Sequence, residues 1–255
     1  MIPRLPECFV EIPLAHRGLH GLKVGCVENG MSSFAEAISK GYGIELDVQL
    51  SKDGHAMVFH DYELDRLTHR SGLVVERSAS ELATTALRDS ADVVPTLNEV
   101  LAFVAGRVPV LVEVKDQDGA FGSGVGPLEH AVSNAVEDYD GPVAVMSFNP
   151  HSVEVMRARM PNTPRGLTTY AVEDRLSDLE PQLLESLIGI RDYDRLEASF
   201  ISHDNGDLDR PRVSELKSQG ARILCWTVRT PSEETAARKV AENITFEGYL
   251  APLSP

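Results

Sequence analysis

This chain of 255 residues is poor in cysteine and in positive charge. Its three cysteines, Cys8, Cys26 and Cys225, are too few and too scattered for a disulfide framework or a zinc site. We therefore expect reduced thiols, which suit a cytoplasmic protein. Only 24 lysines and arginines oppose 39 acidic residues, which gives a formal charge of −15. This charge argues against nucleic acid and anionic membrane surfaces as partners, because both attract stripes of basic residues.

Long apolar runs are also missing. No stretch approaches the roughly 20 apolar residues of a membrane span, and the first 18 residues lack the apolar core of an export signal. We expect a protein without a membrane span and with a cytoplasmic location. Given the overall negative charge, an anionic ligand would have to be held by positive groups placed locally.

The chain does contain a regular alternation of short apolar, β-branched segments with helix-like segments. Thr96 followed by Glu99, and Thr230 followed by acidic residues, are typical helix starts. About eight alternations of strand and helix predict a parallel (β/α)₈ barrel, or TIM barrel, in one domain over residues 1–255. The expected strands are 12–16, 43–50, 108–115, 143–148, 165–170, 198–202, 222–228 and 248–251.

One segment interrupts the alternation after the second expected strand. The stretch LSKDGHAMVFHD predicts a hairpin that turns at Asp53 and Gly54, and it leads into a polar segment at about 61–95. We interpret this segment as a small insertion in the barrel, not as a second domain.

Charged side chains occur in phase on two of the expected strands. In GIELDVQL, Glu45 and Asp47 share one face because side chains alternate along a strand, and Glu113 and Lys115 do so on the next barrel strand. The apolar faces should pack on the helices, so the acids should point into the barrel, where an unpaired charge is costly. A buried ion pair with Lys115 would explain a single acid, whereas three acids together favour a hard cation, Mg²⁺ or Ca²⁺.

Two histidines fall where barrel strands should end. Active sites of TIM barrels lie at the carboxyl ends of the strands, which is where we expect His16, Arg17 and His60. Histidine exchanges protons near neutral pH, so a pair beside a carboxylate cluster indicates acid–base chemistry.

Eight short motifs follow one another along the chain: His16-Arg17-Gly18, Glu28-Asn29, Glu45-x-Asp47, Lys52-Asp53-Gly54, His60-Asp61, Pro95-Thr96-Leu97, Glu113-x-Lys115 and Trp226-Thr227-Val228. In this order and spacing they resemble the glycerophosphodiester phosphodiesterase family. The resemblance covers nearly the whole chain and is densest between His16 and Lys115. The family's fold is a TIM barrel with a small insertion after the second strand, in agreement with the alternation.

The resemblance implies a role for each matching residue. Glu45, Asp47 and Glu113 would hold one divalent cation, His16 and His60 would be the general acid and base, and Arg17 and Lys115 would contact the phosphodiester. The implied reaction is metal-dependent hydrolysis of a glycerophosphodiester to glycerol 3-phosphate and an alcohol. The sequence leaves open which histidine is the acid, and whether water or a substrate hydroxyl attacks.

Trp226 has two interpretations, because the only tryptophan could stack on the substrate or belong to the core. The carboxyl end of the chain departs from the family pattern. Taking 248–251 as the last strand leaves no polar residue at its end and no room for an eighth helix. We expect residues 1–12 or a partner subunit to cover that gap, which keeps a homo-oligomer possible.

Three functions are compatible with these observations. The first is the glycerophosphodiester phosphodiesterase activity. The second keeps the barrel and the metal but acts on a lysophospholipid or another phosphodiester, although relatives of that kind have a reduced insertion and 61–95 is long. The third is a non-catalytic binding protein, which the presence of both histidines and all three carboxylates argues against.

Overall fold

The computed structural model describes residues 2–117, 119–171 and 179–253. Eight parallel strands form a closed barrel in the order β1-β2-β4-β5-β6-β7-β8-β9, and β9 pairs with β1 to complete the ring. The barrel strands are β1 (Leu14–Ala15), β2 (Gly43–Leu50), β4 (Val110–Val114), β5 (Val143–Ser147), β6 (Arg165–Thr169), β7 (Phe200–Asp204), β8 (Arg222–Val228) and β9 (Asn243–Phe246). A ninth strand, β3 (Ala56–Val58), lies outside the ring and pairs with β2. The predicted TIM barrel is confirmed.

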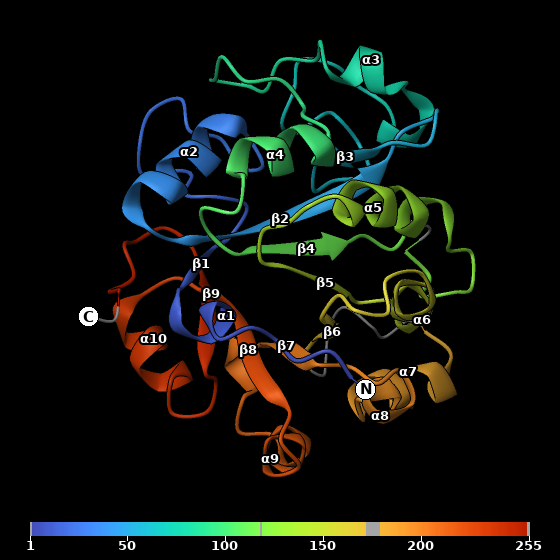
Figure 1. Ribbon diagram of the computed structural model, residues 1–255, viewed down its shortest axis with the longest axis vertical. Helices are drawn as coiled ribbons and strands as arrows, with labels where there is room; N and C mark the ends of the chain where they lie inside the picture. Colours follow the sequence, from blue (N-terminus) through green and yellow to red (C-terminus); the bar gives the residue numbers. More distant parts are fainter. Residues whose placement is uncertain (1, 118, 172–178, 254–255) are drawn as a thin grey trace.

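Helices surround the strands, and their apolar faces pack on the outward-facing strand residues (Figure 1). Among the described residues, no helix has both the length and the apolar character needed to cross a bilayer. The helices are α1 (Cys8–Glu11), α2 (Met31–Lys40), α3 (Ala79–Leu82), α4 (Leu97–Val104), α5 (Pro127–Glu137), α6 (Pro150–Arg159), α7 (Pro181–Ile188), α8 (Asp192–Arg195), α9 (Pro211–Ser218) and α10 (Pro231–Ala237), with 3₁₀ turns η1 (Val74–Glu76) and η2 (Asn205–Asp207).

The hairpin after β2 is present as predicted. β3 runs antiparallel to β2, and the turn between them places Gly54 at φ 85°, a left-handed conformation that glycine adopts without steric cost. The following segment carries η1 and α3 and lies beyond α4 at the top of Figure 1. It has an apolar cluster of its own, formed by Met57, Phe59, Leu64, Leu67, Val74, Leu82, Leu87 and Val94.

The last strand differs from the prediction. It covers Asn243–Phe246, whereas 248–251 is not a strand. The helix predicted to start at Thr230 ends at Ala237, which leaves the apolar segment that follows free to pair with β8 and β1. The side chain of Asn243 then donates hydrogen bonds to the carbonyl oxygens of Phe9 and Ile12, at 2.8 and 2.6 Å.

The amino-terminal segment closes the bottom of the barrel. Leu5 and Phe9 pack against inward-facing residues that precede the site residues along their strands, such as Leu14 before His16 and Leu111 before Glu113. Burying these side chains there removes apolar surface from water and gives the barrel a solid floor. The segment therefore fills the interior at the amino end, and does not replace an outer helix as we expected.

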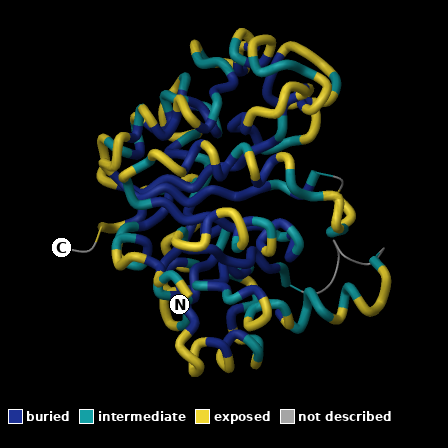
Figure 2. Tube along the Cα trace, turned by 45° about the vertical axis from the view of Figure 1, so that its right-hand side comes forward, coloured by how far each residue is buried: buried dark blue, intermediate teal, exposed yellow. Residues whose placement is uncertain are grey.

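The carboxyl-terminal segment covers the outer face of β9. The ring of Phe246 packs edge-on against Tyr42 and Tyr249, at centroid distances of 4.8 and 5.6 Å, and Ala251 is buried. The Tyr42 hydroxyl donates a hydrogen bond to the Ala251 carbonyl oxygen at 2.6 Å. No helix follows β9 in the described residues up to 253, as expected, and this tail lies on the barrel in its place. Figure 2 shows the buried strands in dark blue inside the exposed loops.

Candidate active site

A cleft of about 840 Å³ opens at the carboxyl ends of the strands. Most of the residues singled out in the sequence line it: His16 and Arg17 follow β1, Asp47 lies in β2, His60 follows β3, Glu113 and Lys115 lie in and after β4, and Trp226 lies in β8. The structure thus brings together side chains that are more than 200 residues apart in the sequence. Glu45 lies one inward-facing position before Asp47, beneath the cleft floor, and its Oε2 accepts a hydrogen bond from the Arg17 backbone N–H at 3.0 Å.

Three carboxylates meet at the bottom of this cleft. Asp47 and Glu113 are register partners on neighbouring strands, and Glu45 is two residues before Asp47, so all three point inward. They are 2% (Glu45), 1% (Asp47) and 6% (Glu113) exposed, and each offers an oxygen within 4.8 Å of those of the other two. A buried cluster of this kind could hold a metal ion through hard oxygen ligands.

Two cations partly neutralise the cluster. Lys115 Nζ lies 2.7 Å from Asp47 Oδ1 and also contacts Glu113, so the ion pair considered for Lys115 is present. Arg17 Nε lies 3.3 Å from Asp47 Oδ2. Burial alone would raise the pKa of Asp47, but these cations, Lys115 foremost, hold it well below its usual value.

Glu45 shows that the neutralisation is incomplete. Burial raises the pKa of Glu45 well above its usual value, and the charges of Asp47 and Glu113 raise it further. Three carboxylates face two cations, so ionisation of all three would leave an excess of negative charge in a poorly solvated place, and the raised pKa favours the neutral form of Glu45. A divalent cation at these oxygens would relieve that excess. The residues present therefore fit the metal that the sequence predicts.

His16 is held by the last strand of the barrel. Its Nδ1 lies 2.8 Å from Oε2 of Glu247, the residue directly after β9. Burial lowers the pKa of His16, and the hydrogen bond to Glu247 only partly opposes this. The same hydrogen bond lowers the pKa of Glu247 to about 2. His16 is then neutral at pH 7 with its proton on Nδ1, which leaves the lone pair on Nε2.

His60 is held by the insertion. Its Nδ1 lies 2.6 Å from Asp61 Oδ1, and Asp61 Oδ2 accepts a hydrogen bond from Arg66 Nε at 2.6 Å. Arg66 also donates to both oxygens of Glu28, at 2.7 and 2.9 Å, and Glu28 accepts from Arg17 at 2.8 Å. This chain of ion pairs connects the loop after β1 with the loop that carries His60.

Asn29 completes the loop after β1. Its Nδ2 donates a hydrogen bond to Asp47 Oδ2 at 2.9 Å, and its Oδ1 accepts from the Asp47 backbone N–H at 3.3 Å. The buried amide thereby orients one carboxylate of the cluster.

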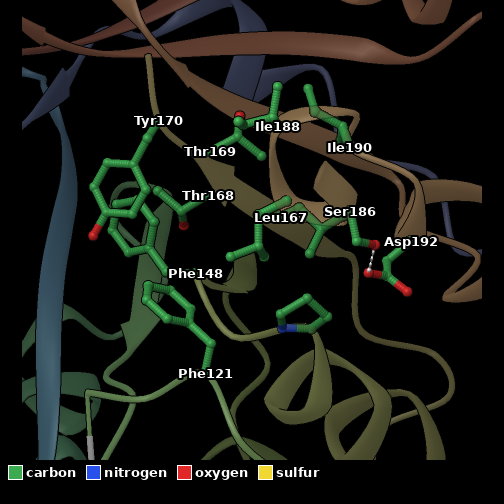
Figure 3. A pocket seen from close by; sticks show the side chains of 12 residues that line it. Phe121, Phe148, Leu167, Thr168, Thr169, Tyr170, Ser186, Ile188, Ile190 and Asp192 are labelled. Carbon is green, nitrogen blue, oxygen red and sulfur yellow. Dashed lines mark hydrogen bonds between the residues drawn. The ribbon is translucent and has the colours of Figure 1, made fainter. Parts of the chain in front are cut away.

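Several aromatic side chains form one wall of the cleft. Trp226 lies edge-on to Phe148 and Tyr170, with centroid distances of 5.3 and 5.9 Å, and its Nε1 donates to the Ser202 carbonyl oxygen at 3.0 Å. It is therefore part of the wall and not of the interior core. Phe148 stacks on Tyr170 at 4.1 Å. Figure 3 shows both rings with Phe121, beside a small cavity of about 20 Å³ that Leu167 and Ile188 also line.

Glu247, Asp61 and Arg66 are site residues to which the sequence reasoning gave no role. The sequence did not identify Glu247 because the last strand was predicted too far along the chain. The polar residue directly after the β-branched segment NITF could have indicated it. His60-Asp61 was recognised as a motif without a role for the acid. Nothing in the local sequence points to Arg66, whose partner Glu28 is 38 residues away.

A comparison of the sequence with known families gives one match over most of the chain. The profile of the glycerophosphoryl diester phosphodiesterase family matches residues 16–244. The chain belongs to this family. The resemblance seen in the sequence and the expectation of an enzyme, a glycerophosphodiester phosphodiesterase, are both confirmed. The membership supports hydrolysis of glycerophosphodiesters.

Individual relatives agree with this assignment. A glycerophosphodiester phosphodiesterase of Caldanaerobacter subterraneus is 31% identical over 225 residues, 84% of either chain. The Bacillus subtilis protein YhdW is 28% identical over 240 residues, 91% of this chain and 90% of its own. Among solved structures, an Oleispira antarctica phosphodiesterase in complex with its product sn-glycerol-3-phosphate has a TM-score of 0.77, 23% identity and 94% coverage of both chains. At that identity the structural likeness concerns the fold.

Proposed function

We propose that this chain hydrolyses glycerophosphodiesters to glycerol 3-phosphate and an alcohol, with His16 and His60 as the acid–base pair. The observation that carries the proposal is the single cleft in which two carboxylate-bonded histidines flank three buried carboxylates. A divalent cation, Mg²⁺ or Ca²⁺, held by Glu45, Asp47 and Glu113 would offset the charge of the phosphate and polarise an oxygen bound to it.

The two histidines have different roles in this proposal. His16 is neutral near pH 7 and its Nδ1 proton is held by Glu247, so Nε2 accepts the proton of the attacking hydroxyl group. His60 protonates the departing alkoxide, which is a poor leaving group without that proton. Asp61 supports this role because its contact with Nδ1 fixes the orientation of the His60 ring in the cleft.

Arg17 and Lys115 supply the local positive charge that an anionic substrate needs. Both line the cleft beside the carboxylates in a protein with a formal charge of −15. The guanidinium of Arg17 suits forked contacts with two phosphate oxygens, and the ammonium of Lys115 acts as a point charge. We assign Trp226 to contact with the glycerol or the head group, because its ring forms part of the cleft wall.

The attacking group is either water or the neighbouring hydroxyl of the glycerol. A substrate in which hydrogen replaces that hydroxyl distinguishes the two. Such a substrate is hydrolysed only if water attacks the phosphorus directly, because the other route requires a cyclic phosphate.

A substrate panel tests the proposed activity. Glycerophosphocholine, glycerophosphoethanolamine, glycerophosphoglycerol, glycerophosphoinositol and a lysophospholipid are each assayed with Mg²⁺ and with Ca²⁺, and glycerol 3-phosphate is measured. We expect its release from at least one glycerophosphodiester. Turnover of the lysophospholipid alone would instead favour the second function, which the aromatic wall could serve by contacting an apolar group. No turnover of any compound would contradict both.

A further inference from the structure

We propose a second metal site, formed by His16, His20 and Glu247, that takes a zinc-like cation and switches off the proton transfer by His16. One nitrogen of each imidazole and one carboxylate oxygen lie within 4.8 Å of one another. All three residues are partly exposed, so the site lies near the surface of the protein.

The fold brings the three donors together. His16 follows β1, Glu247 follows β9, and these strands are neighbours, with Leu14 opposite Thr245. His20 returns to the same place because the chain turns at Gly18, which has φ 80°. A Cβ on Gly18 would lie 2.4 Å from Ser33 Oγ, so the turn requires glycine. The His20 backbone N–H donates to the Gly18 carbonyl oxygen at 3.0 Å and closes the turn.

His20 has a nitrogen that the protein itself does not use. Its Nε2 is buried and has no hydrogen-bond partner among the described residues. An unpartnered buried polar atom is costly, and a ligand that binds it removes the cost. Burial also lowers the pKa of His20, which favours the neutral imidazole that a metal requires.

The donor set differs in kind from the carboxylate cluster. Two imidazoles and one carboxylate are ligands typical of Zn²⁺, whereas the oxygens of Glu45, Asp47 and Glu113 suit Mg²⁺ or Ca²⁺. The two sites should therefore select different cations. Arg229 approaches Glu247 Oε2 at 3.4 Å, but its side chain is 59% exposed and can turn into solvent when a cation enters.

A cation at this site would disable His16 by changing its tautomer. Nδ1 is the nitrogen of His16 that faces Glu247, so a metal shared by these two residues takes the lone pair of Nδ1, and the single proton of the neutral imidazole then lies on Nε2. Nε2 can no longer accept a proton from the nucleophile. This consequence rests on the proposed function, whereas the binding of the metal does not.

The binding is tested by calorimetric titration of ZnCl₂ into protein saturated with Mg²⁺. The variant is His20→Gln, and the matched control is His130→Gln, which removes an exposed histidine of α5. We expect His20→Gln to bind zinc at least about tenfold more weakly than the wild type and the control, since even outer-shell partners of a metal contribute that much. Equal affinity in all three proteins would overturn the proposal.

A second variant and a spectrum distinguish loss of a metal ligand from misfolding of the variant. Glu247→Gln keeps a hydrogen-bonding partner for His16 but removes the charge, and it should also weaken zinc binding. Co²⁺ added to the Mg²⁺-saturated wild type should give the visible absorption of an imidazole-ligated ion, which His20→Gln should lose while its circular dichroism spectrum stays unchanged. Retention of that absorption in His20→Gln would contradict the assignment.

The inhibition is tested separately. With Mg²⁺ present, His20→Gln should hydrolyse substrate at the wild-type rate and need at least about tenfold more zinc for half-inhibition. If zinc inhibits both proteins equally and excess Mg²⁺ relieves the inhibition, zinc binds at the carboxylates and the proposal is overturned. If the wild type turns over no substrate, the proposed function fails, and the titration still decides whether the site exists.

Discussion

The two histidines of the cleft have the same kind of partner in different surroundings. His16 Nδ1 contacts Glu247, and its side chain is 12% exposed; His60 Nδ1 contacts Asp61, and its side chain is 31% exposed. Glu247 comes from the seam where the barrel closes, whereas Asp61 is fixed by Arg66 from the insertion. The barrel therefore positions one histidine and the insertion positions the other.

This difference predicts separate roles for the barrel and the insertion in the two proton transfers. The buried histidine stays neutral and suits a base, and the more open one can exchange its proton with solvent between turnovers. Variation of the insertion would then alter one proton transfer and leave the other unchanged. The predictions below test that division.

The largest effect is expected from the histidines themselves. His16→Ala and His60→Ala should each lower kcat/KM by about 10²- to 10⁴-fold, the usual contribution of a positioned acid or base. His130→Ala is the matched control and should leave it unchanged. Steady-state assays of purified, folded variants measure this, and full activity of either site variant would refute the assignment.

The carboxylate partners should have smaller and distinguishable effects. Glu247→Gln and Asp61→Asn should each lower kcat by about 10- to 100-fold through loss of orientation. Glu247 raises the pKa of His16, so Glu247→Gln should also move the acidic limb of the pH profile to lower pH. Glu137→Gln, on an exposed position of α5, is the control. If the acidic limb of the pH profile stays at the same pH in Glu247→Gln, Glu247 does not raise the pKa of the base.

Arg66 should contribute less, because its side chain is 48% exposed and water screens its ion pairs. Arg66→Gln should cost about 1 kcal/mol or less, seen as a few-fold fall in kcat with KM less affected. Arg70→Gln, an exposed arginine of the same insertion, is the control. The same loss in both variants would mean that the insertion is merely destabilised.

The smallest effect concerns stability in acid. The folded-state pKa of Glu247 is about 2, against an ordinary value of 4.5. A lowered pKa stabilises the fold above the ordinary value, and this contribution disappears as the pH falls from 4.5 towards 2. The difference in free energy of unfolding between wild type and Glu247→Gln should therefore shrink over that interval, as urea denaturation at several pH values would show. A constant difference would contradict the pKa assignment.

The sequence predicted best what depends on strand periodicity. Glu45, Asp47, Glu113 and Lys115 could be placed inside the barrel because alternate residues of a strand face the same way, and the structure brings them together. Glu247 could not be placed, because the last strand was predicted at 248–251, beyond the true end of β9 at Phe246.

Contacts made by the insertion were beyond prediction for another reason. The pairing of Arg66 with Glu28 joins two irregular loops, and no periodicity relates them. The floor of the barrel formed by Leu5 and Phe9 is a tertiary contact of the same kind. The assignment of residues 1–255 to one domain, the cytoplasmic location and a homo-oligomer stay predictions.

The most direct test of the central claim is removal of the divalent cation. Protein treated with EDTA and freed of metal is assayed on the best substrate of the panel, before and after addition of Mg²⁺ or Ca²⁺. We predict that the metal-free protein releases no glycerol 3-phosphate and that one of the two ions restores release. Turnover by the metal-free protein at the untreated rate would contradict this account and make Glu45, Asp47 and Glu113 a purely structural cluster.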